Sequence, residues 1–383
     1  MSVTAAKGFT AAGIAAGIKE NGNPDLALVV NTGPRLAAAG VFTSNRVKAA
    51  PVLWSEQVLK GGLVSAVVLN SGGANACTGP KGFQDTHATA EKVADVLSLN
   101  AGEVAVASTG LIGVTLPMDK LLPGVEKAAG ELSAHGGEKA AIAIKTTDSV
   151  HKTSVVTKDG WTVGGMAKGA GMLAPGLATM LVVLTTDADL GADVLDKALR
   201  DATRLTFDRV DSDGCMSTND TVLLLASGAA EVAPEYADFA EAVREVCDDL
   251  GRQLIGDAEG ASKDIKVEVV NAASEADAVE VGRSIARNNL LKCALHGEDP
   301  NWGRVLSAIG TTSAVFDPNQ LNVAINGVWV CKNGSVGEDR ELVDMRYREV
   351  VITADLAAGA ETATIWTNDL TADYVHENSA YSS

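Results

Sequence analysis

The sequence predicts an α+β fold of layered helices and sheets in the order αββα, with a smaller C-terminal α/β subdomain. Short apolar runs bounded by Gly, Pro or Asn recur through the first half and predict buried strands at 26–31, 37–42, 63–70 and 104–108. Helical patterns alternate with these runs, but without the regular spacing of a doubly wound parallel sheet. Beyond Pro300 the pattern becomes rich in strands and turns, which predicts the subdomain over roughly residues 280–383.

The remaining elements are predicted from periodicity and from residues that break it. Amphipathic patterns predict helices at 85–99, 117–132, 191–206, 236–255 and within 274–292. Pro123 should interrupt the second of these helices, because proline lacks the amide hydrogen that a helix interior uses. Apolar or alternating runs predict further strands at 179–188, 264–271, 321–330, 348–356 and 361–370.

Length and charge limit the class of protein. A chain of 383 residues exceeds the usual size of one core, so two domains or one large layered unit are expected. The net charge of −18 disfavours binding to nucleic acid or to anionic membranes. Residues 1–178 contain 15 Lys and Arg against 13 Asp and Glu, whereas residues 179–383 contain 16 against 36. The simplest interpretation of this asymmetry is a solvated acidic surface on the second half.

Cysteine and histidine positions give no support for disulfides or metals. The five cysteines include no C-x-x-C pair, which favours a reducing cytoplasm. No signal peptide or long apolar run is evident, so we expect neither export nor a membrane span. The histidines lack metal-ligand spacing, and the glycine-rich stretch GGMAKGAGM lacks a phosphate-loop motif. No metal and no cofactor are therefore expected.

The glycine-rich, flexible run that begins at Gly164 changes abruptly into an apolar strand that opens with Thr179. A threonine hydroxyl needs a base before it becomes a nucleophile. Cleavage between Ala178 and Thr179 would create an α-amine beside that hydroxyl, with an ordinary pKa of about 7.7–8.0. On spacing alone, however, a β-branched residue that merely opens a buried strand is the commoner case.

Several motifs nonetheless resemble one family along nearly the whole chain. They are KGAGMLAPGLATML (168–181), NSGGANACTG (70–79), STGLIG (108–113), AEGASK (258–263), DPNWGR (299–304) and HENSAYSS (376–383). In this set and order the chain resembles the ornithine acetyltransferases, also called glutamate N-acetyltransferases, of arginine biosynthesis. Two positions depart from the family pattern: Gly73, where asparagine is expected, and Ser383, where threonine is frequent.

The resemblance implies an N-terminal-nucleophile enzyme that cleaves itself before Thr179. Residues 1–178 would become an α chain and residues 179–383 a β chain. The enzyme would move an acetyl group from N2-acetyl-L-ornithine to L-glutamate through an acetyl-threonine. The developing oxyanion needs fixed donors, and the resemblance assigns them to the Thr109 hydroxyl and the Gly110 N–H.

The resemblance also implies a set of substrate-binding residues. Lys168 would pair with a carboxylate and Glu259 with the ornithine ammonium. Thr146 or Thr147 belongs to the set, with Thr147 favoured. The other members are Thr179 itself, Asn378 and Ser383. The polar tail must then be ordered and fold back into the pocket.

The expected partners are the small-molecule substrates and the paired chains, commonly a heterotetramer of two α and two β chains. The sequence leaves open whether acetyl-CoA is also a donor. Two alternatives remain: a self-cleaving aminopeptidase or amidohydrolase that passes the acyl group to water, and an uncleaved binding protein with Thr179 packed in a strand. Lys168, Glu259 and the tail favour the transferase, because a peptidase has less need of two opposite charges around one amino acid.

Overall fold

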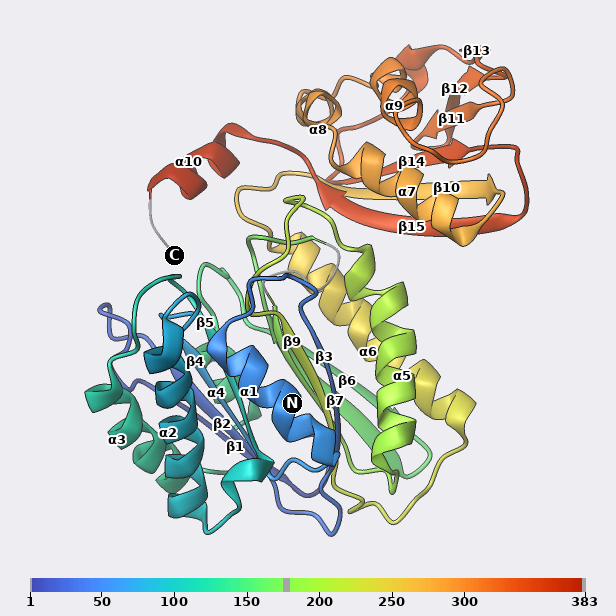
Figure 1. Ribbon diagram of the computed structural model, residues 1–383. Coiled ribbons are helices and arrows are strands. Elements are labelled where there is room, and N and C mark those ends of the chain that lie inside the picture. Colours follow the sequence, from blue (N-terminus) through green and yellow to red (C-terminus); the bar gives the residue numbers. More distant parts are fainter. Residues whose placement is uncertain (1, 175–179, 381–383) are drawn as a thin grey trace. The chain divides into compact units, whose positions relative to one another are not determined.

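The computed structural model describes residues 2–174 and 180–380, which form two compact units (Figure 1). The first unit comprises residues 2–208 and 215–257. The second comprises residues 209–214 and 258–380. Strands and helices are mixed in both units, which confirms the predicted α+β class.

The first unit contains a four-stranded sheet whose strands lie in the order β1-β2-β4-β5. Its strands are β1 (Phe9–Ile14), β2 (Leu26–Asn31), β4 (Ala66–Ser71) and β5 (Val104–Thr109). The β4/β5 pair is parallel, and the other two pairs are antiparallel. Strands β2, β4 and β5 are buried along their whole length, and each is continuously apolar until polar residues end it.

A five-stranded sheet of the same unit has the order β3-β9-β8-β7-β6. Its strands are β3 (Ala37–Phe42), β6 (Lys152–Lys158), β7 (Trp161–Lys168), β8 (Leu181–Thr186) and β9 (Thr221–Ala226). The β8/β9 pair is parallel and the other pairs are antiparallel. The end of β7 therefore lies beside the beginning of β8, where Lys168 pairs with Leu181.

These two sheets enclose a shared apolar core, and helices cover their outer faces (Figure 1). Helices α2 (Gly79–Leu97) and α3 (Met118–Gly130) pack on the four-stranded sheet. Helices α5 (Ala192–Leu205) and α6 (Tyr236–Gly256) pack on the five-stranded sheet. The predicted αββα layering is therefore present. The unit also contains α1 (Ala50–Val58), α4 (Gly137–Ala143) and the short 3₁₀ turns Leu59–Gly61 and Ala101–Glu103.

The glycine-rich stretch contradicts the expectation of a flexible run, because its first part is the buried strand β7. A Cβ atom at Gly164 would lie 2.4 Å from the carbonyl oxygen of Ser2. At Gly165 it would lie 2.7 Å from the side chain of Leu184. Glycine therefore serves close packing here rather than freedom of the backbone.

Helix α3 also differs from expectation, because it continues through Pro123 instead of being interrupted there. Proline removes the hydrogen bond that its own amide would donate to residue 119, and its ring crowds the carbonyl of that residue. The buried residues Leu121 and Val125 lie on either side of Pro123 and pack in the core under this helix. Packing of that apolar face outweighs the local cost of the proline.

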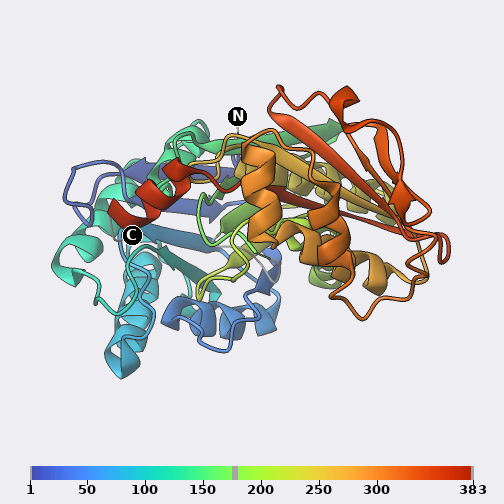
Figure 2. The same ribbon diagram turned by 90° about the horizontal axis from the view of Figure 1, so that it is seen from above.

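The second unit is built on a six-stranded sheet in the order β13-β12-β11-β14-β10-β15. Its strands are β10 (Asp264–Ala272), β11 (Asn322–Ile325), β12 (Val328–Lys332), β13 (Ser335–Val336), β14 (Glu349–Asp355) and β15 (Glu361–Asn368). Its helices are α7 (Glu275–Ala286), α8 (Asn289–His296), α9 (Trp302–Ile309) and α10 (Ala372–Ala380). Helix α7 lies along β10 and β15 (Figures 1 and 2). The apolar residues of α7, α8 and α9 join the alternate buried residues of the strands in one core.

Candidate functional site

Thr109 is the last residue of β5, and its side chain is buried at the edge of the four-stranded sheet. Its carbonyl oxygen accepts hydrogen bonds from the amides of Gly72 (2.9 Å) and Gly73 (3.0 Å). Its hydroxyl accepts a hydrogen bond of 3.2 Å from the ammonium of Lys168. Since this bond uses a lone pair of the hydroxyl oxygen, the hydroxyl proton is left for another acceptor.

Gly110 follows directly and turns the chain away from the sheet. Its φ of 131° lies in a region that side chains rarely adopt. A Cβ atom at this position would lie 2.5 Å from the amide nitrogen of Gly73. Conformation and close approach therefore both require glycine here.

Lys168 is the last residue of β7 and is almost fully buried, with 2% of its surface exposed. A buried ammonium is costly unless it meets negative charge and hydrogen-bond acceptors. The nearby carboxylate of Asp148 provides negative charge, since the field of Lys168 helps to lower the pKa of Asp148. Of the predicted site residues, the structure brings Lys168 and Thr109 into direct contact.

The carboxylate of Asp148 connects three segments around Lys168. Oδ1 accepts hydrogen bonds of 2.6 Å from both the Gly169 amide and the Lys152 ammonium, and Oδ2 accepts one of 3.0 Å from the Thr146 amide. Burial by itself would raise the pKa of Asp148, but the two lysines and the Gly169 amide lower it to about 2. Asp148 is therefore an ionised, buried acceptor at neutral pH.

Sequence reasoning missed Asp148, although it identified its neighbours. The available signal was its position in KTTDS, directly after the two threonines of which one is predicted to contact substrate. Lys152 has a second carboxylate partner, Asp257, at 2.5 Å. The two carboxylates balance the two buried lysines, which keeps the net charge of this cluster near zero.

A pocket of about 610 Å³ opens beside the turn at Gly110. Thr146 and Thr147 both line it, so the structure does not separate the two alternatives for the predicted substrate-binding threonine. Lys19 also lines the pocket, and burial lowers the pKa of this lysine. Gly110, a predicted oxyanion donor, therefore lines the same pocket as the predicted substrate-binding threonine.

Asp220 is a second buried acid that the sequence reasoning missed. Its Oδ1 accepts a hydrogen bond of 3.0 Å from the amide of Met180, the residue before β8. Its Oδ2 is buried and has no hydrogen-bond partner among the described residues. Burial raises the pKa of Asp220 well above its ordinary value, even though the charge of Lys168 acts in the opposite direction.

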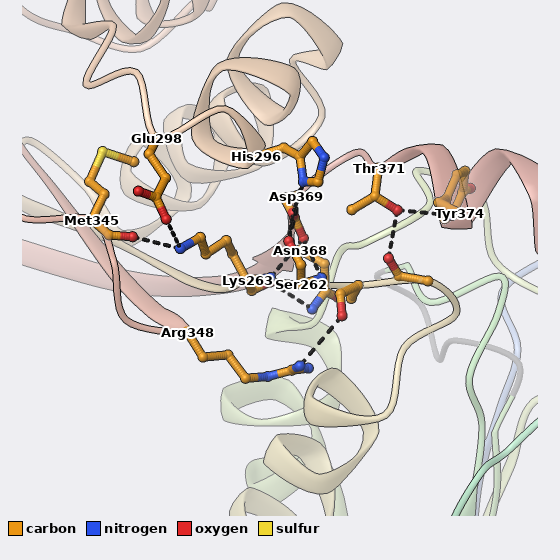
Figure 3. Close-up of polar contacts among 12 residues, drawn as sticks. Ser262, Lys263, His296, Glu298, Met345, Arg348, Asn368, Asp369, Thr371 and Tyr374 are labelled. Atoms are coloured by element: carbon orange, nitrogen blue, oxygen red, sulfur yellow. Dashed lines mark hydrogen bonds and ion pairs between the residues drawn. The ribbon is translucent and has the colours of Figure 1, made fainter.

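Glu259 and Asn378 belong to the second unit. Glu259 is buried in the segment 258–263, which follows α6 and precedes β10. Asn378 is exposed in α10, where its side-chain amide donates to the carbonyl of Tyr374 at 3.0 Å. Hydrogen bonds join the two segments, as Figure 3 shows. The convergence of these residues with Lys168 and Thr109 stays a prediction.

Three predicted positions lie outside the described residues: Ala178 and Thr179 at the expected cleavage point, and Ser383 at the end of the chain. Within the described part, no group of three or more His, Cys, Asp or Glu side chains is placed to hold a metal ion. In residues 2–174 and 180–380, every helix is too short or too polar to span a bilayer.

A sequence profile of the ArgJ family matches residues 10–383. The chain belongs to this family. The prediction that it belongs with the ornithine acetyltransferases is thereby confirmed, and so is the prediction that it is an enzyme.

Family relatives named "Arginine biosynthesis bifunctional protein ArgJ" include one from Streptomyces avermitilis, 89% identical over 100% of both chains. Another, from Mycobacterium leprae, is 58% identical over 100% of this chain and 96% of its own. The protein is thus an ArgJ-family enzyme of arginine biosynthesis.

Solved structures of the family show similarity over part of the chain. The ornithine acetyltransferase of Mycobacterium tuberculosis, crystallised with ornithine, is 62% identical over 47% of this chain and 96% of its own, with a TM-score of 0.45. The ArgJ protein of Bacillus halodurans is 38% identical over 47% of this chain and 95% of its own, with a TM-score of 0.42.

Proposed function

We propose that the enzyme transfers the acetyl group of N2-acetyl-L-ornithine to L-glutamate through an acetyl ester on Thr179. The products are L-ornithine and N-acetyl-L-glutamate. The contact between the Lys168 ammonium and the Thr109 hydroxyl, next to the beginning of β8, is the observation that supports this most directly. It combines a buried cation with an oriented hydroxyl donor, as acyl transfer to and from an amino acid requires.

Maturation comes first in this proposal. The hydroxyl oxygen of Thr179 attacks the carbonyl carbon of Ala178, the peptide C–N bond breaks, and an ester forms while the nitrogen gains a proton. Water then hydrolyses the ester. This frees the carboxylate of Ala178 and leaves Thr179 with an α-amine that accepts the proton of its own hydroxyl. Residues 1–178 and 179–383 become the α and β chains.

Transfer then uses the same nucleophile twice. Attack on the acetyl carbonyl of acetylornithine places negative charge on its oxygen, which the Thr109 hydroxyl and the Gly110 N–H stabilise. Because the Lys168 ammonium donates to the Thr109 oxygen, it polarises that hydroxyl and makes it a stronger donor. Ornithine leaves with the proton as its amide C–N bond breaks. In the second half-reaction the α-amine of glutamate attacks the acetyl-threonine, the ester C–O bond breaks, and the Thr179 oxygen regains its proton as N-acetyl-L-glutamate leaves. No cofactor is needed for this chemistry.

Substrate recognition divides between opposite charges. The Lys168 ammonium pairs with the α-carboxylate. Glu259 binds the side-chain ammonium of ornithine. Thr147 contributes from the wall of the pocket. Asn378 and Ser383 complete the site from the C-terminal tail.

The proposed assembly is a heterotetramer of two α and two β chains in the cytoplasm. The native mass of the purified protein tests the assembly. Replacing acetylornithine by acetyl-CoA in the glutamate assay tests whether a second donor is used.

Intact mass spectrometry of the denatured protein, followed by an acetylation assay, tests the function. We expect two chains divided between Ala178 and Thr179, and N-acetylglutamate formed only when acetylornithine is present. Thr179→Ala should give one full-length chain and no transfer. Two chains from that variant would refute the proposed nucleophile.

The same experiment separates the alternative functions. Acetate released from acetylornithine without acetylation of glutamate would identify an amidohydrolase. A single uncleaved chain from the wild-type protein, without activity, would identify a binding protein.

A further inference from the structure

Asp369 fixes the segment 258–263 inside the second unit (Figure 3). Its Oδ1 accepts hydrogen bonds from the amides of Ser262 (2.9 Å) and Lys263 (2.8 Å). Its Oδ2 contacts the Ser262 hydroxyl and lies 3.0 Å from Nδ1 of His296. Since the Asp369 side chain is fully shielded from solvent, these contacts hold the segment in one conformation.

Two residues further on, Thr371 joins the same segment to the C-terminal helix. Its hydroxyl donates a hydrogen bond of 2.6 Å to the carbonyl oxygen of Gly260. The Thr371 hydroxyl oxygen also accepts a hydrogen bond of 2.8 Å from the amide of Tyr374, in the first turn of α10. Thr371 therefore caps α10 and ties its beginning to the residue that follows Glu259.

Gly260 allows this close approach. Its φ is 62°, and a Cβ atom there would lie 2.2 Å from the amide nitrogen of Tyr374. The backbone of α10 thus packs directly on the glycine. The hydroxyl of Tyr374 adds a further hydrogen bond, of 2.9 Å, to Asp213.

The position of Asn378 follows from this anchor. Asn378 lies four residues after Tyr374, on the same face of α10, and donates to the Tyr374 carbonyl. A displacement of the first turn of α10 would therefore move Asn378 relative to Glu259.

We propose that Thr371 is a positioning residue that holds Asn378 and Glu259 in register for substrate binding, by joining α10 to Gly260. This inference rests on the proposed function, because it assumes that both residues contact the substrate. Thr371 does not itself react, so its loss weakens binding of acetylornithine and glutamate more than it slows the chemical step.

The test compares Thr371→Val, which keeps the shape but removes both hydrogen bonds, with Thr371→Ser, which keeps the hydroxyl. For the valine variant we expect KM to rise roughly tenfold for both substrates, with kcat nearly unchanged. The serine variant should restore the wild-type KM. Thr312→Val is the matched control: it removes a hydroxyl that bonds the Ile309 carbonyl at 2.7 Å, at the end of α9 in the same unit.

Hydrogen exchange in α10 gives a second readout that needs no activity. Thr371→Val should speed exchange of the α10 amides, whereas Thr371→Ser and Thr312→Val should leave it unchanged. Wild-type exchange rates in Thr371→Val would overturn the inference, as would an unchanged KM in an active enzyme. A third outcome separates the inference from the proposed function: Thr371→Val speeds exchange, but the wild-type protein transfers no acetyl group. The proposed function then fails, and only the anchoring of α10 by Thr371 stands.

Discussion

The ammonium of Lys168 donates to the hydroxyl of Thr109 over 3.2 Å, across two different sheets of the first unit. Thr109 ends a strand of the four-stranded sheet, and Lys168 ends a strand of the five-stranded sheet. The contact therefore joins the end of β5 in one sheet to the end of β7 in the other. Its polarity leaves the Thr109 proton available to an acyl oxygen.

Thr109→Ala should reduce kcat by about 10²–10³-fold, the usual effect of removing one oxyanion donor. Thr109→Ser keeps a hydroxyl and should retain most of the activity. Steady-state kinetics with acetylornithine and glutamate measure both variants. Unchanged kinetics in the alanine variant would place the oxyanion donors elsewhere.

Gly110→Ala should both destabilise the protein and abolish transfer, because the new Cβ meets the backbone at Gly73. Gly113→Ala is the matched control, since Gly113 also has a positive φ, of 83°, but open space around it. We expect a cost of about 1–2 kcal/mol from the positive φ alone in the control, and a larger cost at Gly110. Urea denaturation measures both values, and equal costs would contradict the crowding argument.

Asp148→Asn should lower the stability of the folded protein at neutral pH, and this loss relative to wild type should disappear in acid. The pKa of Asp148 in the folded protein is about 2, below its ordinary value of 3.8, so ionisation favours the folded state above about pH 4. This contribution, about 2 kcal/mol, is lost as the pH falls from about 4 to about 2. Urea midpoints of wild type and variant should therefore converge in that range.

A second variant, Asp257→Asn, separates the loss of a negative charge beside Lys152 from the loss of the hydrogen bonds that Asp148 alone accepts. Asp257→Asn removes the other carboxylate that binds Lys152 but leaves the bonds of Asp148 to Gly169 and Thr146 intact. We expect Asp148→Asn to raise the KM for both substrates, and Asp257→Asn to raise it less. Equal kinetic effects would show that Asp148 acts only through Lys152.

Asp220→Asn should stabilise the protein increasingly as the pH rises. Burial raises the pKa of Asp220, so the wild type is favoured by protonation below the ordinary value of 3.8 and loses this stability as the pH rises through the folded-state pKa. Asparagine has the same shape, still accepts from the Met180 amide and does not ionise. A variant less stable than wild type at pH 8 would show that the folded state favours the ionised carboxylate, and would contradict the raised pKa of Asp220.

The layered core was predictable from sequence because its strands are continuous apolar runs, such as Leu26–Asn31 and Ala37–Phe42. Strand β7 was not predictable, because the adjacent residues Gly164 and Gly165 are typical of loops. In this strand they are needed because neighbouring atoms approach too closely to leave room for a Cβ. Periodicity records local apolar spacing and contains no information on such tertiary contacts.

The candidate site divides in the same way. Motif resemblance identified Thr109 and Lys168, which the structure joins. Asp148 and Asp220 carry no motif, and their roles depend on burial and on donors distant in sequence, such as the Gly169 and Met180 amides. The presence of an isolated Asp or Glu in a sequence does not show whether its carboxylate is solvated or buried.

The carbonyl oxygen of Thr109 is held by two backbone amides, those of Gly72 and Gly73, and not by side chains at those positions. Position 73 should consequently tolerate a side chain. A Cβ there would meet only the tip of Leu116, at 2.7 Å, and a flexible leucine end is free to rotate aside. Exchange of Gly73 for the asparagine expected from the family pattern would then leave the orientation of the Thr109 hydroxyl unchanged.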